Sequence, residues 1–253
     1  ESETRHGVIS AHKFIEQDLD SKVSSDIAKH TSQSLAILLG DIVFAWAYKE
    51  FSKDNQTKDS WNIIHTLVEE VILGQMMDVY NPIEKSTTMI AVENKMLLKT
   101  ARYTFTYPLL LGAVLANVNN KDTECIKNFG DATGLLFQMQ DDVFDFTKDV
   151  ATLKKNPLGD IKNGVHTMLS VYINENATNE DIKKWSTWFS NKDTNNQDEL
   201  NSFLKSTGAF DFAEYYIKQK EAMALEAVSN SSLKNEDAEK IKSLLSIVTN
   251  RKY

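Results

Sequence analysis

The stretch FQMQDDVFDF, residues 137–146, places three aspartates inside a segment that otherwise has the composition of a buried helix. Gln138, Asp141, Asp142 and Asp145 have the i, i+3, i+4, i+7 spacing that shares one helix face. The phenylalanines of the stretch point elsewhere, so the acids would form a narrow polar stripe on an apolar helix. Burying carboxylates in this way is costly unless a cation meets them.

The stripe has two interpretations. A solvated helix face would mix lysine, arginine and glutamate in i,i+4 charge pairs, whereas here like charges are stacked. Divalent ions bound between the carboxylates would offset this repulsion, so the stripe favours a metal site. Mg²⁺ is the expected ion, because it prefers carboxylate oxygens and substrate phosphates, and no histidine or cysteine lies close by.

The composition predicts one all-α domain over residues 1–253. Hydrophobic residues make up 42% of the chain, which excludes a disordered protein, and 9 Gly with 3 Pro leave few obligatory turns. The helix at 84–101 would begin with Ser86 or Thr87 as its cap. Helical periodicity predicts helices at 31–51, 59–80, 84–101, 103–118, 122–147, 165–175, 178–190, 208–228 and 235–253.

Charge and apolar runs exclude several classes of protein. A net charge of −8 and a pI of about 5.2 argue against a general nucleic-acid binder. The apolar runs at 35–48 and 105–118 are shorter than a membrane span, so we expect core helices and no integral membrane segment. The single Cys125 needs no oxidising compartment and no signal peptide is visible, so we expect a cytoplasmic protein.

Six segments resemble, in order, the motifs of one enzyme family. The longest is GLLFQMQDDVFDF (134–146), which resembles a Gly-x-x-Phe-Gln-x-x-Asp-Asp-x-x-Asp pattern. The others are RHGVISAH (5–12), AILLGD (36–41), GQMMD (74–78), KTA (99–101) and LKKNPLGDIKNGVHT (153–167). Together they resemble the trans-isoprenyl diphosphate synthases, which include the farnesyl, geranylgeranyl and longer polyprenyl diphosphate synthases.

The resemblance implies an all-α isoprenoid-synthase bundle around a central cavity. In this family two facing aspartate motifs hold three Mg²⁺ ions on the diphosphate of an allylic substrate. The metals assist ionisation to an allylic cation, which isopentenyl diphosphate attacks, and diphosphate is released. The pocket must be dry because water would quench the cation.

The resemblance also assigns roles to individual residues. Asp141, Asp142 and Asp145 would be metal ligands, and Asp141, Asp142 and Lys99 would form the catalytic centre. Phe137 would line the pocket near the isopentenyl group. The allylic diphosphate would contact the polar residues of the matched motifs: Arg5, Lys99, Thr100, Gln138 and Lys155.

The sequence departs from the family pattern at three places. The family's first aspartate-rich motif is absent, so we expect that its first helices are missing and that these 253 residues alone are inactive. His6 stands where the family has an arginine for the isopentenyl diphosphate, and it would give a weaker, pH-dependent contact. Val165 stands where the family often has a lysine, so one cation on the allylic diphosphate is missing.

Two alternatives to a prenyl diphosphate synthase stay open. A terpene synthase would cyclise the same substrate, but such enzymes usually have Ser or Thr and Glu where this chain has Asp145 and Asp149. A non-catalytic subunit of a partner synthase would explain His6 and Val165, but it has no need of three stacked aspartates. By analogy with the family we expect a homodimer, and the apolar 103–118 helix is either its interface or part of the core.

Overall fold

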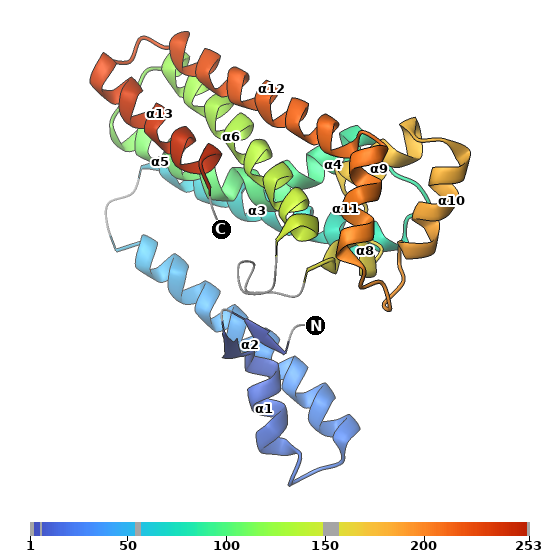
Figure 1. Ribbon diagram of the computed structural model, residues 1–253. Coiled ribbons are helices and arrows are strands. Elements are labelled where there is room, and N and C mark those ends of the chain that lie inside the picture. Colours follow the sequence, from blue (N-terminus) through green and yellow to red (C-terminus); the bar gives the residue numbers. More distant parts are fainter. Residues whose placement is uncertain (1–2, 6, 54–56, 149–156, 252–253) are drawn as a thin grey trace. The chain divides into compact units, whose positions relative to one another are not determined.

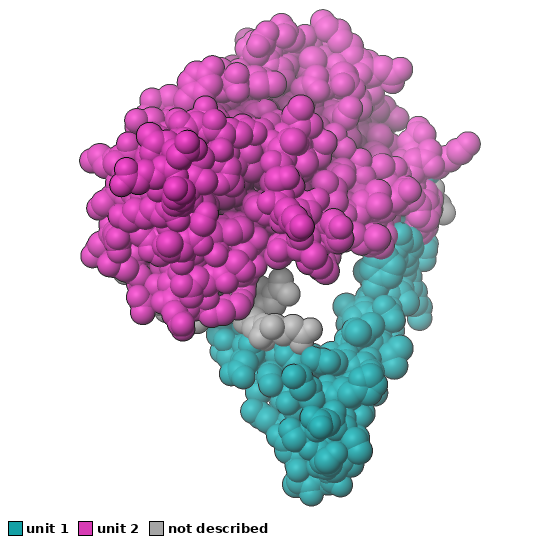
Figure 2. All heavy atoms as spheres, turned by 90° about the vertical axis from the view of Figure 1, so that its right-hand side faces the viewer, with its two compact units in different colours: residues 1–57 teal, residues 58–253 magenta. Residues whose placement is uncertain are grey.

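The computed structural model describes residues 3–5, 7–53, 57–148 and 157–251. Contacts between residues group the chain into two compact units, residues 1–57 and residues 58–253, which Figure 2 colours separately. The expected single domain over residues 1–253 stays a prediction.

Residues 1–57 contain a short hairpin and two helices (Figure 1). Strands β1 (Thr4–Arg5) and β2 (Val8–Ile9) pair antiparallel, and Gly7 takes a φ of +77° in the turn between them, which a glycine adopts without strain. Helix α1 (Ala11–Leu19) packs against α2 (Ser25–Phe51). The large apolar side chains of α2 are mostly exposed within this unit, and they include Ile37, Leu38, Ile42, Val43, Phe44 and Trp46.

Residues 58–253 form a bundle of helices. Its elements in chain order are α3 (Lys58–Tyr80), the 3₁₀ turn η1 (Asn81–Ile83), α4 (Met89–Met96), the π-helix η2 (Leu97–Thr106), α5 (Tyr107–Leu115), α6 (Asn120–Thr147), α8 (Gly159–Lys162), α9 (Met168–Asn176), α10 (Asn179–Trp188), α11 (Gln197–Ser206), α12 (Ala209–Ser229) and α13 (Asn235–Thr249). The all-α fold class is therefore confirmed.

Helix α6, which carries the aspartate stripe, is the central helix of this unit. It packs along α12 and against η2, as Figure 1 shows for α12. Phe129, Leu136 and Met139 are fully buried on it, because they face the hydrophobic clusters that it shares with the neighbouring helices. The stripe is thus fixed by packing on the other faces of the same helix.

The structure tests the start of one predicted helix and the burial of another. The helix expected at 84–101 begins only at Met89, and its cap is Thr88, whose Oγ1 accepts a hydrogen bond of 3.2 Å from the Ala91 amide. The expected cap at Ser86 or Thr87 is therefore wrong. The inner face of residues 103–118 is part of the core, because Tyr107, Leu110 and Ala113 are buried.

None of the helices in the described ranges has both the length and the apolar character that crossing a membrane requires.

Candidate functional site

The π-helix η2 lies in close contact with both α3 and α6. A Cβ at Gly74 of α3 would lie 2.3 Å from the Lys99 amide nitrogen, and one at Gly134 of α6 would lie 2.4 Å from the Ala101 Cβ. Only glycine permits such an approach of two helix backbones at these positions. The two glycines thereby bring Lys99 and Thr100 of η2 between α3 and the aspartate stripe.

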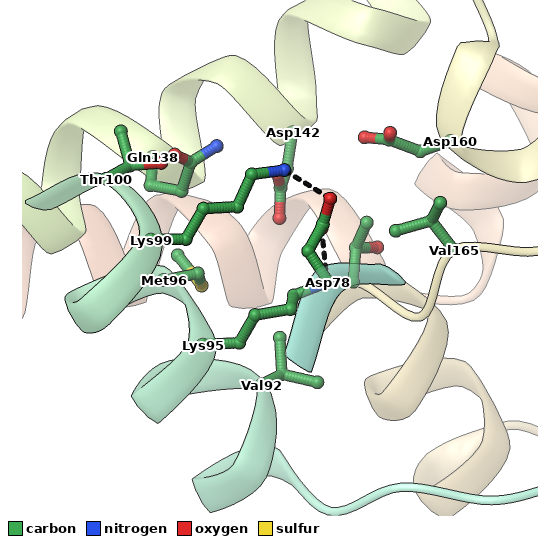
Figure 3. Close-up of a pocket in the computed structure, with 11 residues that line it drawn as sticks. Asp78, Val92, Lys95, Met96, Lys99, Thr100, Gln138, Asp142, Asp160 and Val165 are labelled. Carbon is green, nitrogen blue, oxygen red and sulfur yellow. Dashed lines mark hydrogen bonds and ion pairs between the residues drawn. The ribbon is translucent and has the colours of Figure 1, made fainter. Parts of the chain in front are cut away.

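A pocket opens at this junction, and we name it the Lys99 pocket (Figure 3). Its cavity volume is about 110 Å³, and its lining comes from α3, α4, η2, α6, α8 and the segment before α9. The lining residues are Asp78, Val92, Lys95, Met96, Lys99, Thr100, Gln138, Asp142, Asp160, Val165 and Thr167.

Asp78 holds the two lysines of the Lys99 pocket. Its carboxylate lies 2.5 Å from the Lys99 Nζ and 3.7 Å from the Lys95 Nζ, and both contacts are drawn in Figure 3. The Lys99 contact is a charge-assisted hydrogen bond, whereas the Lys95 distance is that of a looser ion pair. Lys99 remains partly exposed toward the pocket, with 37% of its side chain accessible.

Asp142 is the member of the aspartate stripe that lines the Lys99 pocket, and it is buried. Burial raises its pKa well above the usual range of an aspartate, and the negative charges of Asp160 and Asp141 act in the same direction. Lys95 and a hydrogen bond from Gln138 oppose this shift without cancelling it. Asp142 is thus a carboxyl group whose ionised form needs an additional cation.

The other two aspartates of the stripe have different partners. Asp145 is 1% exposed, and one of its carboxylate oxygens accepts a hydrogen bond of 3.3 Å from the Asp160 amide, which ties the end of α6 to α8. Asp141 is paired with Arg251 near the C-terminus, whose Nη2 donates to its Oδ1 at 2.7 Å. The Arg251 guanidinium also lies over the Phe137 ring, 3.8 Å from its centroid.

The donor set of this region suits Mg²⁺ in type. Carboxylate oxygens line the Lys99 pocket, with two lysines against three aspartates, so an anion with several negative charges would need added cations there. Among the residues that the structure describes, no three Asp, Glu, His or Cys side chains are grouped so as to hold a metal by themselves. Mg²⁺ usually keeps several waters and takes further oxygens from substrate phosphates, so one or two carboxylates suffice for the protein's share.

Comparison with known proteins identifies the family. The family model described as polyprenyl synthetase matches residues 1–207. The chain belongs to the polyprenyl synthetase family. The predicted membership of the trans-isoprenyl diphosphate synthases is thereby confirmed.

Relatives within the polyprenyl synthetase family include named isoprenyl diphosphate synthases. A short chain isoprenyl diphosphate synthase of Methanocaldococcus jannaschii is 31% identical over 160 residues, which are 60% of this chain and 46% of the relative. A geranylgeranyl diphosphate synthase of Sulfolobus acidocaldarius is 26% identical over 216 residues, which are 80% of this chain and 63% of the relative. The chain therefore spans less than two thirds of these relatives.

Solved structures share the fold. A geranylgeranyl pyrophosphate synthase from Corynebacterium glutamicum, solved in complex with isoprenyl diphosphate and magnesium, superposes with a TM-score of 0.87 at 23% identity. The match covers 99% of this chain and 72% of that structure. The helical fold of the isoprenyl diphosphate synthases is thus confirmed for this chain.

Four of the predicted site residues, Lys99, Thr100, Gln138 and Asp142, come together in the Lys99 pocket. Asp141, Asp145 and Phe137 lie on the same helix but are not among its lining residues. Arg5 belongs to β1 in the first unit, and His6 and Lys155 lie outside the described residues. Their predicted contacts with substrate stay predictions.

Sequence reasoning missed Asp78, Lys95, Asp160, Thr167 and Arg251 as members of this region. Asp78 ends the quoted GQMMD segment, so its motif was the available signal. Lys95 stands four residues before Lys99, a spacing that brings two side chains to one helix face. The pairing of Arg251 with Asp141 could not be predicted from the sequence, because it depends on the path of the chain after α13.

Proposed function

We propose that the full-length protein is a prenyltransferase that condenses isopentenyl diphosphate with an allylic diphosphate, such as dimethylallyl, geranyl or farnesyl diphosphate, and releases diphosphate. The observation that carries this proposal is the convergence of Lys99, Thr100, Gln138 and Asp142 on one pocket in a member of the polyprenyl synthetase family. Lys99, Thr100 and Gln138 offer a positive charge and hydrogen bonds to a diphosphate. Asp142 requires a cation, which a metal bound to that diphosphate would supply.

Each of these residues has a distinct task in the proposed reaction. Lys99 and Thr100 bind and orient the allylic diphosphate, and Asp78 holds the Lys99 ammonium in position. Gln138 donates a hydrogen bond to Asp142 and keeps that carboxylate aimed at the pocket. Asp141, Asp142 and Asp145 are the proposed ligands of Mg²⁺, of which three ions are expected with the substrate. When bound, the metal supplies positive charge that favours departure of the diphosphate.

Arg251 adds one requirement to this proposal. Its guanidinium donates to Oδ1 of Asp141 at 2.7 Å, so a metal that takes this oxygen must exchange places with Arg251. The exchange replaces the guanidinium by a metal ion, so a positive charge lies beside the Asp141 carboxylate before and after it. Once released, Arg251 would remain beside Phe137, which we propose to line the isopentenyl side of the site.

The remaining proposals concern the whole protein. We expect a homodimer, contacts of Arg5 and Lys155 with the allylic diphosphate, and a contact of His6 with the isopentenyl diphosphate. Nucleic acid is not an expected partner, and a cytoplasmic location stays a prediction.

The activity is tested with purified full-length protein, Mg²⁺, isopentenyl diphosphate and each allylic diphosphate in turn. We expect pyrophosphate release together with a lengthened prenyl product, detected by chromatography. A product formed without isopentenyl diphosphate would indicate a terpene synthase instead. Pyrophosphate release that requires a second polypeptide would indicate a supporting subunit.

Asp141→Ala tests the metal site within this activity. Loss of a metal-binding carboxylate should remove several kcal/mol of charge stabilisation in the transition state, so we expect turnover to fall by about a hundredfold or more. Circular dichroism and the Tm should show that the variant remains folded.

The matched control for this variant is Glu124→Ala. Glu124 also lies on α6, but its side chain is 61% exposed and pairs with Lys127 at 3.6 Å. Such a surface pair contributes little, so the control should keep normal turnover. Near-normal activity of Asp141→Ala would contradict the assignment of the metal site.

A further inference from the structure

A second lysine, Lys95, lies in the Lys99 pocket, outside the quoted sequence motifs. Lys95 lies in the last turn of α4 and is only 7% exposed. A charged side chain that is buried in this way is costly without full compensation. Its nearest acid is Asp78, at 3.7 Å. That carboxylate is already engaged by Lys99 at 2.5 Å, so it compensates Lys95 only in part.

The hydrogen bonds of Lys95 also leave capacity for a ligand. Its ammonium donates to the His166 carbonyl oxygen at 3.1 Å, and an ammonium group has three donors. His166 is held independently, because its backbone amide donates to the Asn81 side chain at 2.6 Å and its ring contacts the Glu84 carbonyl at 3.1 Å. Lys95 is therefore not needed to fix that segment.

Lys95 contacts residues 164–167, the segment in which the resemblance implies a lysine where this chain has Val165. Residues 164–167 read Gly-Val-His-Thr, and both Val165 and Thr167 line the Lys99 pocket. Lys95 reaches the same pocket from α4, on the other wall, as Figure 3 shows for Val165 and Lys95. The charge absent at Val165 is thus present in the same cavity on a different element.

We propose that Lys95 is a further diphosphate-binding residue, which supplies from α4 the positive charge that the 164–167 segment lacks at Val165. The inference rests on the proposed prenyltransferase function and deepens it. Lys95 and Lys99 then bind the diphosphate together, and the Asp78 carboxylate, which is paired with both ammonium groups, lies between them.

The electrostatics of the pocket are consistent with this role. Burial lowers the pKa of the Lys95 ammonium, while Asp78, Asp142 and Asp160 act in the opposite direction. A bound diphosphate would add negative charge beside Lys95 and stabilise its protonated form. The same anion would be repelled by Asp142 and Asp160 unless Mg²⁺ accompanied it, so binding should require the metal.

The test measures binding of inorganic pyrophosphate with Mg²⁺ to the full-length protein by isothermal titration calorimetry. In Lys95→Met, which keeps an unbranched side chain of similar length and removes the charge, we expect the affinity to fall by about ten- to a hundredfold. The double variant Lys95→Met/Val165→Lys restores a cation from the opposite wall, and recovered affinity supports the proposal. If Lys95→Met lowers the Tm strongly, Lys95→Gln takes its place, because its amide can still donate to the His166 carbonyl.

Lys220→Met is the matched control. Lys220 is also buried, at 8% exposure, and it pairs with Glu93 at 2.7 Å, but it does not line the Lys99 pocket. Its replacement should lower the Tm without weakening pyrophosphate binding. A Lys95 variant that binds pyrophosphate as tightly as the wild type overturns the proposal for Lys95 and leaves the proposed function intact. A wild-type protein that binds no pyrophosphate with Mg²⁺ overturns the proposed function itself.

Discussion

Asp142 is a residue whose burial and acidic neighbours act against its own ionisation. The folded protein holds its proton at a pH where the unfolded chain, with an aspartate pKa of about 3.9, has already lost it. The free energy of unfolding therefore falls as pH rises from this value through the raised pKa of the folded state. Asp142 is retained at a cost in stability that a bound cation would offset.

Because Asp142 is destabilising when ionised without a metal, we expect Asp142→Asn to change the stability of the protein in the presence of EDTA. At pH 7.5 the variant should be more stable than the wild type by at least about 1 kcal/mol, because it has no charge to bury. At pH 4 the difference should shrink, since Asp142 is then protonated in the folded state and about half protonated in the unfolded chain. Urea denaturation at the two pH values measures both free energies.

Asp122 provides a control of opposite sign. Its carboxylate accepts hydrogen bonds from the Ser232 amide at 2.6 Å and the Ser232 hydroxyl at 2.7 Å, and these bonds lower its pKa. A lowered pKa contributes stability above the unfolded value that is lost as pH falls, so Asp122→Asn should destabilise the protein at pH 7.5. Equal responses of the two variants would contradict the electrostatic account.

The sequence motifs predicted part of the candidate site. Lys99, Thr100, Gln138 and Asp142 stand in motifs whose order along the chain is informative, and they meet in the Lys99 pocket. Asp78, Lys95 and Asp160 reach it from α3, α4 and α8, and their burial depends on how these helices pack. From its sequence neighbours alone, Lys95 would be predicted to be a surface residue, because its burial depends on tertiary contacts.

At the scale of elements, long helices were predictable and their details were not. Helices α3, α6 and α12 begin and end within about two residues of the predicted ranges, because their apolar periodicity extends over many turns. Helices α1 and α11 were not predicted, since both are short and polar. The π-helix η2 changes the rotation per residue from Leu97 to Thr106, so the direction of Lys99 could not be derived from a period of 3.6.

The packing of η2 against α3 leads to a prediction at Gly74. In Gly74→Ala the new Cβ would lie 2.3 Å from the Lys99 amide nitrogen and 2.6 Å from the Leu98 carbonyl carbon, so the two backbones must separate. We expect the free energy of unfolding to fall by about 1–3 kcal/mol. Pyrophosphate affinity should fall as well, because the displaced backbone carries Lys99.

Gly112→Ala serves as the control for this substitution. Gly112 lies inside α5, and an added Cβ would meet nothing within 4 Å. An alanine in a helix interior is more favourable than a glycine by about 1 kcal/mol, so this variant should be as stable as the wild type or more stable. Loss of stability in both variants would show that close packing at Gly74 is not the cause.

At the scale of the whole molecule, the second unit exposes an apolar face on α3. Ile72, Met76 and Val79 are 54%, 63% and 66% exposed, and their spacing places them on one side of α3. Ile83 of the following turn η1 is 71% exposed. Contiguous apolar surfaces of this kind mark interaction sites. The α3 face is therefore a candidate for the expected homodimer interface, and the outer face of residues 103–118 stays an alternative to it.

The oligomeric state of the full-length protein tests this interpretation. We expect a homodimer in analytical ultracentrifugation, and Met76→Glu/Val79→Glu should raise its dissociation constant by at least about a hundredfold, because two carboxylates would be buried without partners. Ile247→Glu is the matched control, since Ile247 is equally exposed, at 68%, but lies on α13. A dimer that persists in the double variant excludes the α3 face, and a dimer lost only in the Ile247 variant places the interface on α13. Turnover measured on the monomeric variant would then show whether assembly is required for prenyl transfer, since each subunit carries its own Lys99 pocket.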